Sequence, residues 1–349
     1  MRNVSYAFVH FLKKTKKGGK LVEPRGFLSR EILSQKVVME KPNERVVLIP
    51  FRANNIFATV AETFWVIAGK DDMAFLSYYL PRAIEFSDDG KVWRAAYGPR
   101  IRSWAGRVDQ VKEVLKVLRE KDTKRAVMSI FDPLSDYSSS SKDIPCNNWI
   151  QFLERNGKLH MNIALRANDL FWGFSGINSF EWSVLQELVA FELGKKIGNL
   201  TFFVGSLHYY ERHFHLVDDI INNFEKSVYD FGIMSVPLKT DFNSLDSTLK
   251  QWFLYEKRIR RGEDVLPEIS QIKDPFFCES LKMMMVYSKY KREKNLDEIL
   301  AIIEIMPESD LRASVIEYMV RKFGIGLLKK LKLTPREVEF FSFFYRRLL

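Results

Sequence analysis

The sequence predicts an α/β (α+β) protein of strands and helices, followed by an all-helical C-terminal extension. The first observation is Asn156-Gly157, which separates two strand-like runs. This is a strong hairpin signal, because a type I′ turn needs positive φ at both positions. A helical pattern and a further strand then follow, up to residue 214. The second observation is that the patterns after about residue 236 are continuously helical.

The domain organisation follows from these changes of pattern. We expect a basic flexible arm at residues 1–20, an α/β domain at residues 21–235 and a helical extension at residues 236–349. The arm is expected because its sequence, MRNVSYAFVHFLKKTKKGGK, ends in a basic run that contains glycine. The extension has the usual size of a small domain.

The whole chain carries a formal charge of +10 and two cysteines. The charge favours an anionic partner, either a nucleic acid or a phosphorylated metabolite, although a solvated lysine-rich surface would give the same charge. Cys146 and Cys278 are too far apart for a CxxC motif, and free thiols suit a reducing compartment. Neither a signal peptide nor a run of roughly 18 apolar residues is found, so we expect a soluble cytoplasmic protein.

Residues 54–69, NNIFATVAETFWVIAG, predict the first helix of the α/β domain, with Gly69 as its cap. Glu62 lies at the edge of the apolar stripe of this helix. It is either a buried carboxyl with a raised pKa, as in a general acid, or a glutamate on the solvent side. A second amphipathic helix, residues 108–121, precedes the basic pair Lys124-Arg125 and a strand.

Cys146 begins the first strand of the predicted hairpin, directly after a polar loop at residues 135–143. Arg166 ends the second strand, so the hairpin brings a thiol and a guanidinium to the same edge of a sheet. A positive neighbour lowers the pKa of a thiol and prepares it as a nucleophile. Cys146 is therefore a candidate nucleophile, and the alternative is a small hydrophobic residue that happens to lie there.

A helix is expected from about Asn178 to Lys196, and the strand after it, residues 200–214, ends in a run rich in histidine and tyrosine. The histidines of this run, His208, His213 and His215, match no standard zinc spacing, so we expect no metal site. The chain also lacks a GxGxxG or P-loop sequence.

Several motifs in residues 145–214 resemble, in order, the thymidylate synthase family, which includes the pyrimidine nucleotide hydroxymethylases. They are PC before a strand, R-x-N-D at the end of the hairpin, a glycine and then an asparagine that opens a helix, and H-x-Y after the last strand. Upstream, AETFWVIAG, AAYGPRI and DTKRAVMS resemble the family's glutamate helix, Tyr-Gly segment and paired-arginine segment. The resemblance covers roughly residues 20–230 and does not extend to the helical tail. It implies a thymidylate synthase-like fold, with a mixed sheet flanked by helices.

The resemblance implies one-carbon transfer from 5,10-methylenetetrahydrofolate to carbon 5 of a pyrimidine nucleoside 5′-monophosphate, of the uridylate type and above all dUMP. Carbon 5 is a poor nucleophile, so in the family a thiolate first adds to carbon 6, and Cys146 matches that thiolate. The family also implies a homodimer with a shared phosphate site.

The phosphate site of the family matches four cationic positions of this chain. Arg25 and Arg166 match arginines that bind phosphate within one subunit, with Arg30 as the alternative to Arg25. Lys124 and Arg125 match the pair that reaches across the dimer interface, with lysine in place of the first arginine.

Further positions match the catalytic and binding residues of the family. Glu62 matches the acid that organises water, Tyr97 belongs to the same network, and Asn178 matches the residue that reads the pyrimidine edge. An asparagine there suits uracil, because its amide both donates and accepts. The remaining matches are Asn168 and Asp169 for the substrate, Asp169 and Phe86 for folate, and His208 with Tyr210 for the sugar hydroxyl.

Departures from the family pattern bear on the product. Synthases carry a tryptophan pair that covers the folate and shields the reactive methylene from water, and here Ala83 and Phe86 take those places, with Trp93 nearer the tyrosine. A small residue lets water reach the methylene, which favours a hydroxymethyl product. Ala167 replaces a serine after the phosphate arginine. Ser206 replaces an aspartate near the sugar, which leaves ribose and deoxyribose both open.

Three functions remain open from the sequence. The first is a hydroxymethylase that acts on a uridylate. The second is a thymidylate synthase that makes dTMP by reductive methylation. The third is a non-catalytic RNA-binding protein on the same fold, which would use the basic arm and the aromatic residues among basic ones in QWFLYEKRIRR. An amphipathic helix with its aromatic residues in the core also explains that stretch.

Overall fold

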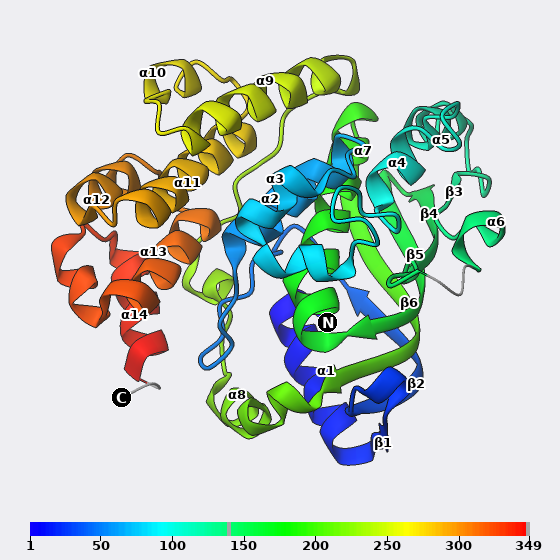
Figure 1. Ribbon diagram of the computed structural model, residues 1–349, viewed down its shortest axis with the longest axis horizontal. Coiled ribbons are helices and arrows are strands. Elements are labelled where there is room, and N and C mark those ends of the chain that lie inside the picture. The colour runs from blue at the N-terminus through cyan, green and yellow to red at the C-terminus, as the bar shows by residue number, and fades with distance from the viewer. Residues whose placement is uncertain (138–140, 347–349) are drawn as a thin grey trace. The chain divides into compact units, whose positions relative to one another are not determined.

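The computed structural model describes residues 1–137 and 141–346. Its mixed sheet flanked by helices confirms the predicted α/β class. Figure 1 shows the strands gathered in one curved sheet, whereas the described chain after the last strand, drawn from green to red, forms helices and loops. The all-helical character of the C-terminal part is therefore confirmed.

The chain divides into two compact units. The first combines Met1–Asn43 with Ala58–Val217, and the second combines Glu44–Phe57 with Asp218–Leu349. The helical unit thus begins before the boundary predicted at residue 235. It also includes a segment from the first part of the sequence, for which the pattern gave no signal.

Six strands form one sheet in the order β1-β2-β6-β5-β4-β3. Their bounds are β1 Lys20–Val22, β2 Ser29–Met39, β3 Val127–Ser129, β4 Asn147–Arg155, β5 Lys158–Asp169 and β6 Lys196–Tyr210. β5 and β6 are parallel, and the other neighbouring pairs are antiparallel. Because parallel strands end at the same edge of a sheet, Asp169 lies in register with His208.

The hairpin of β4 and β5 turns at Asn156 and Gly157, whose φ angles are 54° and 73°. Both are positive, as a type I′ turn requires, so this prediction is confirmed. At the other end of the hairpin the backbone N–H of Arg166 donates to the carbonyl oxygen of Cys146 at 2.9 Å. The thiol-bearing and guanidinium-bearing residues are therefore neighbours, as expected.

The prediction of a flexible arm at residues 1–20 is wrong, because Val4–Gly18 form helix α1. Asn3 caps this helix by accepting hydrogen bonds from the backbone amides of Ser5 and Tyr6. Apolar residues at helical spacing, among them Phe8, are buried, and the helix packs on β2. The lysines that suggested an arm occupy the exposed face of an amphipathic helix.

Other helices cover the sheet and frame one of its edges. α7, Ser179–Glu192, packs on β5 and β6. The predicted helix at residues 54–69 is α2, Ile56–Ile67, and Gly69 follows it with a φ of 73°. Further helices are α3 Met73–Tyr79, α4 Tyr97–Arg102, α5 Gln110–Val117 and α6 Pro133–Asp136.

The second unit is built around helix α11, which packs against α9, α12 and α13. Its helices are α8 Val217–Asn223, α9 Phe242–Arg260, α10 Leu266–Ile269, α11 Pro275–Arg292, α12 Leu296–Glu304, α13 Asp310–Phe323 and α14 Pro335–Arg346. The hydroxyl of Tyr229 donates to Asp310 at 2.8 Å and accepts from the amide of Val46 at 2.9 Å. The bond from Val46 to Tyr229 is one of the contacts that join residues 44–57 to the helical unit.

Helix α9 carries the stretch that suggested RNA binding. Trp252 in this stretch is fully buried, and its indole N–H donates to Ser280 Oγ at 2.9 Å. A buried indole cannot stack on a base, so the amphipathic-helix interpretation fits this tryptophan. In the part of the chain that the structure describes, no helix has the length and apolar character needed to cross a membrane.

Candidate active site

A cavity of about 270 Å³ lies at the edge of the sheet where the parallel strands β5 and β6 end. Helix α2, the start of α4 and the segment before β4 complete its wall. Such strand ends are common places for ligands. Of the predicted site residues, the wall includes Arg25, Glu62, Phe86, Tyr97, Cys146, Arg166, Asn168, Asp169, Asn178, His208 and Tyr210.

Lys124 and Arg125 are predicted site residues that lie elsewhere. Both are exposed in the loop before β3 and are not part of the cavity wall formed by the described residues. Their assignment to the phosphate of a second subunit stays a prediction. Arg30, the alternative to Arg25, donates from Nη1 to the carbonyl of Gly19 at 3.1 Å and also lies outside the wall, so the geometry favours Arg25.

Arg166 fixes the segment that carries Cys146. Its Nε and Nη2 donate to the carbonyl oxygens of Pro145 and Ile144 at 3.0 and 2.7 Å. Burial raises the pKa of the Cys146 thiol, and the positive charges of Arg166 and Arg25 act against this rise. Arg166 thus lowers the pKa of the thiol as expected, but burial raises this pKa by more.

Glu62 projects from α2 into the cavity wall, so it is not a glutamate of the solvent side. Burial and then the negative charge of Asp143 raise the pKa of Glu62 to about 8. Its Oε2 is buried and accepts no hydrogen bond from the described residues. Glu62 is therefore protonated at neutral pH and can act as a general acid.

Glu181, in the first turn of α7, is a second buried carboxyl. It is 0% exposed, and neither of its carboxyl oxygens has a hydrogen-bond partner within residues 1–137 and 141–346. Burial, followed by the charge of Glu62, raises the pKa of Glu181 well above its usual value. Burial also raises the pKa of Tyr97, to which the charges of Cys146 and Glu181 add. The interior behind the cavity thus favours neutral, protonated groups.

The side chains of two asparagines lie close to the backbone of Gly173. Asn168 is the second-last residue of β5, and Asn178 ends the π-helix Leu170–Asn178 that follows. A Cβ atom on Gly173 would lie 2.1 Å from Asn168 Oδ1 and 3.4 Å from Asn178 Oδ1. Only glycine leaves room there for both amides, so Gly173 shapes this part of the cavity.

Asp169, two residues at the end of β6 and Arg212 just after β6 form the next part of the wall. The Asp169 side chain accepts two backbone N–H groups of the π-helix and lies 3.6 Å from Arg212 Nη2. The rings of His208 and Tyr210 meet edge-on with centroids 5.0 Å apart. The guanidinium of Arg212 lies 4.4 Å from the centroid of the Tyr210 ring. Hydrogen-bonding groups and one cation therefore cluster where the two strands end.

Aromatic rings form a further part of the wall. Phe86 stacks on Trp93 with ring centroids 5.9 Å apart and planes 8° apart. The indole N–H of Trp93 donates to Asp143 Oδ2 at 2.8 Å. Ala83 is fully buried and is not among the described wall residues, so the expectation that it opens a gap over the cavity is wrong. The short helical turn Pro81–Phe86 directs the Ala83 side chain into the core instead.

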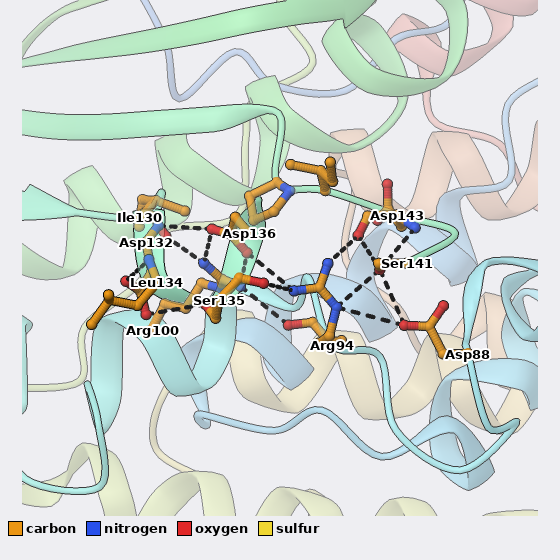
Figure 2. A network of polar contacts seen from close by, with 12 residues as sticks. Asp88, Arg94, Arg100, Ile130, Asp132, Leu134, Ser135, Asp136, Ser141 and Asp143 are labelled. Atoms are coloured by element: carbon orange, nitrogen blue, oxygen red, sulfur yellow. Dashed lines mark hydrogen bonds and ion pairs between the residues drawn. The ribbon is translucent and has the colours of Figure 1, made fainter. Parts of the chain in front are cut away.

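Arg94 holds the loop that carries Asp143, as Figure 2 shows. Its Nη2 donates to the carbonyl oxygen of Asp143 at 2.8 Å, and its Nε donates to Ser141 Oγ at 2.9 Å. On the other side, its Nη1 lies 3.4 Å from Asp136, whose buried carboxylate accepts two hydrogen bonds from Arg100 at 2.6 and 2.7 Å. Asp136 of α6, held by Arg100 of α4, thus helps to position Arg94, and Arg94 fixes the backbone of Asp143.

The sequence reasoning missed three residues of this region: Asp143, Arg212 and Glu181. Signals existed for two of them. Asp143 stands three positions before Cys146, and Glu181 is a charge between the aromatic residues Phe180 and Trp182. Arg212 lies in the histidine-rich run that was considered only for zinc spacing.

Comparison with known proteins gives consistent matches. The thymidylate synthase family model matches residues 7–253. The deoxyuridylate hydroxymethyltransferase of Delftia phage PhiW-14 is 30% identical, over 93% of this chain and 96% of its own length. The deoxyuridylate hydroxymethyltransferase of Bacillus phage SP01 is 28% identical, over 90% of this chain and 91% of its own length. A putative thymidylate synthase of Methanothermobacter marburgensis is 29% identical, over 59% of this chain and 89% of its own length.

The two phage matches correct one expectation. Since each covers nine-tenths or more of this chain, the similarity extends into the helical unit. The resemblance therefore does not end near residue 230, as the motifs alone suggested.

Proposed function

The chain belongs to the thymidylate synthase family, and from this premise we propose that it transfers a hydroxymethyl group to carbon 5 of dUMP. The phage relatives, named deoxyuridylate hydroxymethyltransferases, support this substrate and product. The observation that carries the proposal is one cavity that holds a thiol, a protonated carboxyl and an amide beside two arginines. These residues are Cys146, Glu62, Asn178, Arg25 and Arg166.

Cys146 is the proposed nucleophile. Its sulfur adds to carbon 6 of the pyrimidine, and the electron pair of the ring double bond moves toward the carbonyl at carbon 4. Carbon 5 thereby gains the electron density that it needs to attack a one-carbon unit. Arg166 holds the backbone just before Cys146, and its charge favours the thiolate over the thiol.

Glu62 and Asn178 are the proposed partners of the pyrimidine ring. Glu62 is protonated at neutral pH, so it can donate to the carbonyl oxygen at carbon 4 as negative charge develops there. The amide of Asn178 both donates and accepts, which suits the N3 and carbonyl edge of uracil. Tyr97 supplies a further hydroxyl to this network.

Arg25 and Arg166 are proposed to bind the phosphate of the nucleotide, because guanidinium groups pair well with phosphate oxygens. His208 and Tyr210 are proposed to bind the sugar, and Asn168 and Asp169 to contact the substrate.

5,10-Methylenetetrahydrofolate is the proposed source of the carbon. The stacked rings of Phe86 and Trp93 fit a flat pterin ring, and Trp172, which is 38% exposed, adds a third aromatic group to the wall. Asp169 offers a carboxylate to a ring N–H group. Phe86 and Asp169 are thus the residues that we propose for the folate.

The direct test is incubation of the protein with dUMP and methylenetetrahydrofolate, followed by mass spectrometry of the nucleotide. We expect tetrahydrofolate and 5-hydroxymethyl-dUMP. Formation of dihydrofolate and dTMP would identify a thymidylate synthase instead. Absence of turnover with dUMP, UMP, dCMP and CMP, together with salt-sensitive binding of RNA, would favour the non-catalytic alternative.

A further inference from the structure

Asp143 is a cavity carboxyl that the chemistry above leaves without a task. It belongs to the segment that leads into β4, three positions before Cys146. In addition to burial, its negative charge contributes to the raised pKa values of Glu62, Tyr97 and Cys146. One carboxyl group therefore acts on the acid, the phenol and the nucleophile of the same site.

The position of this carboxyl is fixed through both its side chain and its backbone. Trp93 donates to Oδ2 at 2.8 Å. Arg94 and Ser141 each donate to the carbonyl oxygen at 2.8 Å (Figure 2). A carboxylate can accept about four hydrogen bonds, so the bond from Trp93 leaves capacity for a water molecule. Asp143 is thus an oriented acceptor in the wall that is proposed to face the folate.

Glu62 and Asp143 are carboxyl groups in different environments. Burial raises the pKa of both, and the charge of Asp143 raises that of Glu62 further. For Asp143, however, the Trp93 hydrogen bond and the charges of Arg166 and Arg25 act against the rise. Pairs of this kind can divide the roles of acid and base between them.

We propose that Asp143 is the general base for the water molecule that adds to the exocyclic methylene of the nucleotide, and that it thereby directs the reaction to the hydroxymethyl product. This proposal rests on the proposed function. The methylene is the carbon attached to C5 after tetrahydrofolate has left, while Cys146 is still bonded to C6.

The step balances without an oxidant or a reductant. The water oxygen forms a bond to the methylene carbon, one O–H bond breaks, and the proton passes to Asp143. The electron pair of the C5–methylene double bond moves into the ring as an enolate. The enolate then restores the C5–C6 double bond and expels the Cys146 thiolate, which takes up the proton from Asp143.

Asp143→Asn tests this role in a reaction that contains dUMP tritiated at C5, methylenetetrahydrofolate and 2-mercaptoethanol. Tritium release reports the steps up to methylene formation, and mass spectrometry reports the hydroxymethyl product. We expect the hydroxymethyl product to fall about 100-fold, the usual scale of a lost general base. Tritium release is expected to stay close to wild type, and the methylene is expected to be captured as a 2-mercaptoethanol thioether.

Asp88→Asn is the matched control, because Asp88 binds the same loop but is not among the described wall residues. It accepts hydrogen bonds from the Lys142 amide at 2.8 Å and from Ser141 at 3.1 Å. This control is expected to keep the wild-type ratio of hydroxymethyl product to tritium release. Trp93→Phe is a second variant, for use if Asp143→Asn does not fold. It keeps a stacked ring but removes the N–H group that donates to Asp143, so it is expected to lower the ratio of hydroxymethyl product to tritium release.

Two results would overturn the role of Asp143. One is an unchanged ratio in Asp143→Asn, including the case in which tritium release and product fall equally, and the other is the same change of ratio in Asp88→Asn. A wild-type protein that makes no hydroxymethyl product would instead contradict the proposed function itself.

Discussion

At the scale of single residues, burial sets the protonation of Glu62. Burial, with the charge of Asp143, raises its pKa from 4.5 to about 8. Between these two pH values the carboxyl is ionised in the unfolded chain but stays protonated in the folded one. The unfolded chain then binds fewer protons, so this group lowers the stability of the fold as the pH rises from 4.5 to 8. A protein keeps such a group where its chemistry needs a proton donor.

Glu62→Gln removes this titration. We expect the melting temperature of the variant to rise relative to wild type, and to rise more at pH 8 than at pH 5. Activity is expected to fall by about 100-fold or more, because the amide cannot deliver a proton. Thermal unfolding at both pH values and kcat/KM for dUMP measure these effects. Glu113→Gln is the control, because the side chain of Glu113 is 54% exposed. An equal shift of the melting temperature at pH 5 and pH 8 in Glu62→Gln would contradict the raised pKa of Glu62.

At the scale of secondary structure, the π-helix Leu170–Asn178 shapes the nucleotide side of the cavity. Its wide turns begin directly after Asp169, whose side chain caps them, and they end at Asn178. Gly173 lies within this helix, where a Cβ atom would lie 2.1 Å from Asn168 Oδ1. Asn168 is 3% exposed, so its side chain has little room to move away.

Gly173→Ala is therefore expected to displace the amide of Asn168. Overpacking of this kind destabilises a protein by about 1–3 kcal/mol, and the displaced amide should also raise KM for dUMP more than KM for the folate. Thermal unfolding and steady-state kinetics with each substrate varied in turn test this. Gly18→Ala is the matched control, since a Cβ atom there would meet no neighbouring group within 4 Å and the φ of Gly18 is not positive. An unchanged KM for dUMP would show that Gly173 has no role in placing Asn168.

At the scale of the whole molecule, local signals predicted some features and long-range contacts decided others. Asn156-Gly157 predicts its hairpin because the turn needs only its own two residues. Asp143 stands close to Cys146 in the sequence, but its orientation depends on Arg94, some 50 residues earlier in the chain, so local sequence alone does not predict how it is placed. Helix α1 was missed because its lysine run outweighed the apolar spacing of residues such as Phe8. The assignment of residues 44–57 to the helical unit likewise rests on distant contacts.

Lys124 and Arg125 lead to the prediction that concerns the assembly. Both are exposed and lie outside the described wall of the cavity in their own chain, whereas Arg25 and Arg166 line it. If a second copy supplies Arg125, then Arg125→Ala and Cys146→Ala, each nearly inactive alone, should complement each other after subunit exchange. Half of the dimers would be mixed, and one of their two sites would be intact, so activity should approach about one quarter of wild type.

Glu62→Gln mixed with Cys146→Ala is the matched control for this exchange. Glu62 and Cys146 line the same cavity of one chain, so every site of a mixed dimer would still lack one of them and activity should stay low. Sedimentation of the wild-type protein as a monomer would contradict the shared site. A mixture of Arg125→Ala and Cys146→Ala that exchanges subunits without gaining activity would also contradict the shared site. Its mixed dimers would contain one intact Arg125 and one intact Cys146, and yet no active site would form.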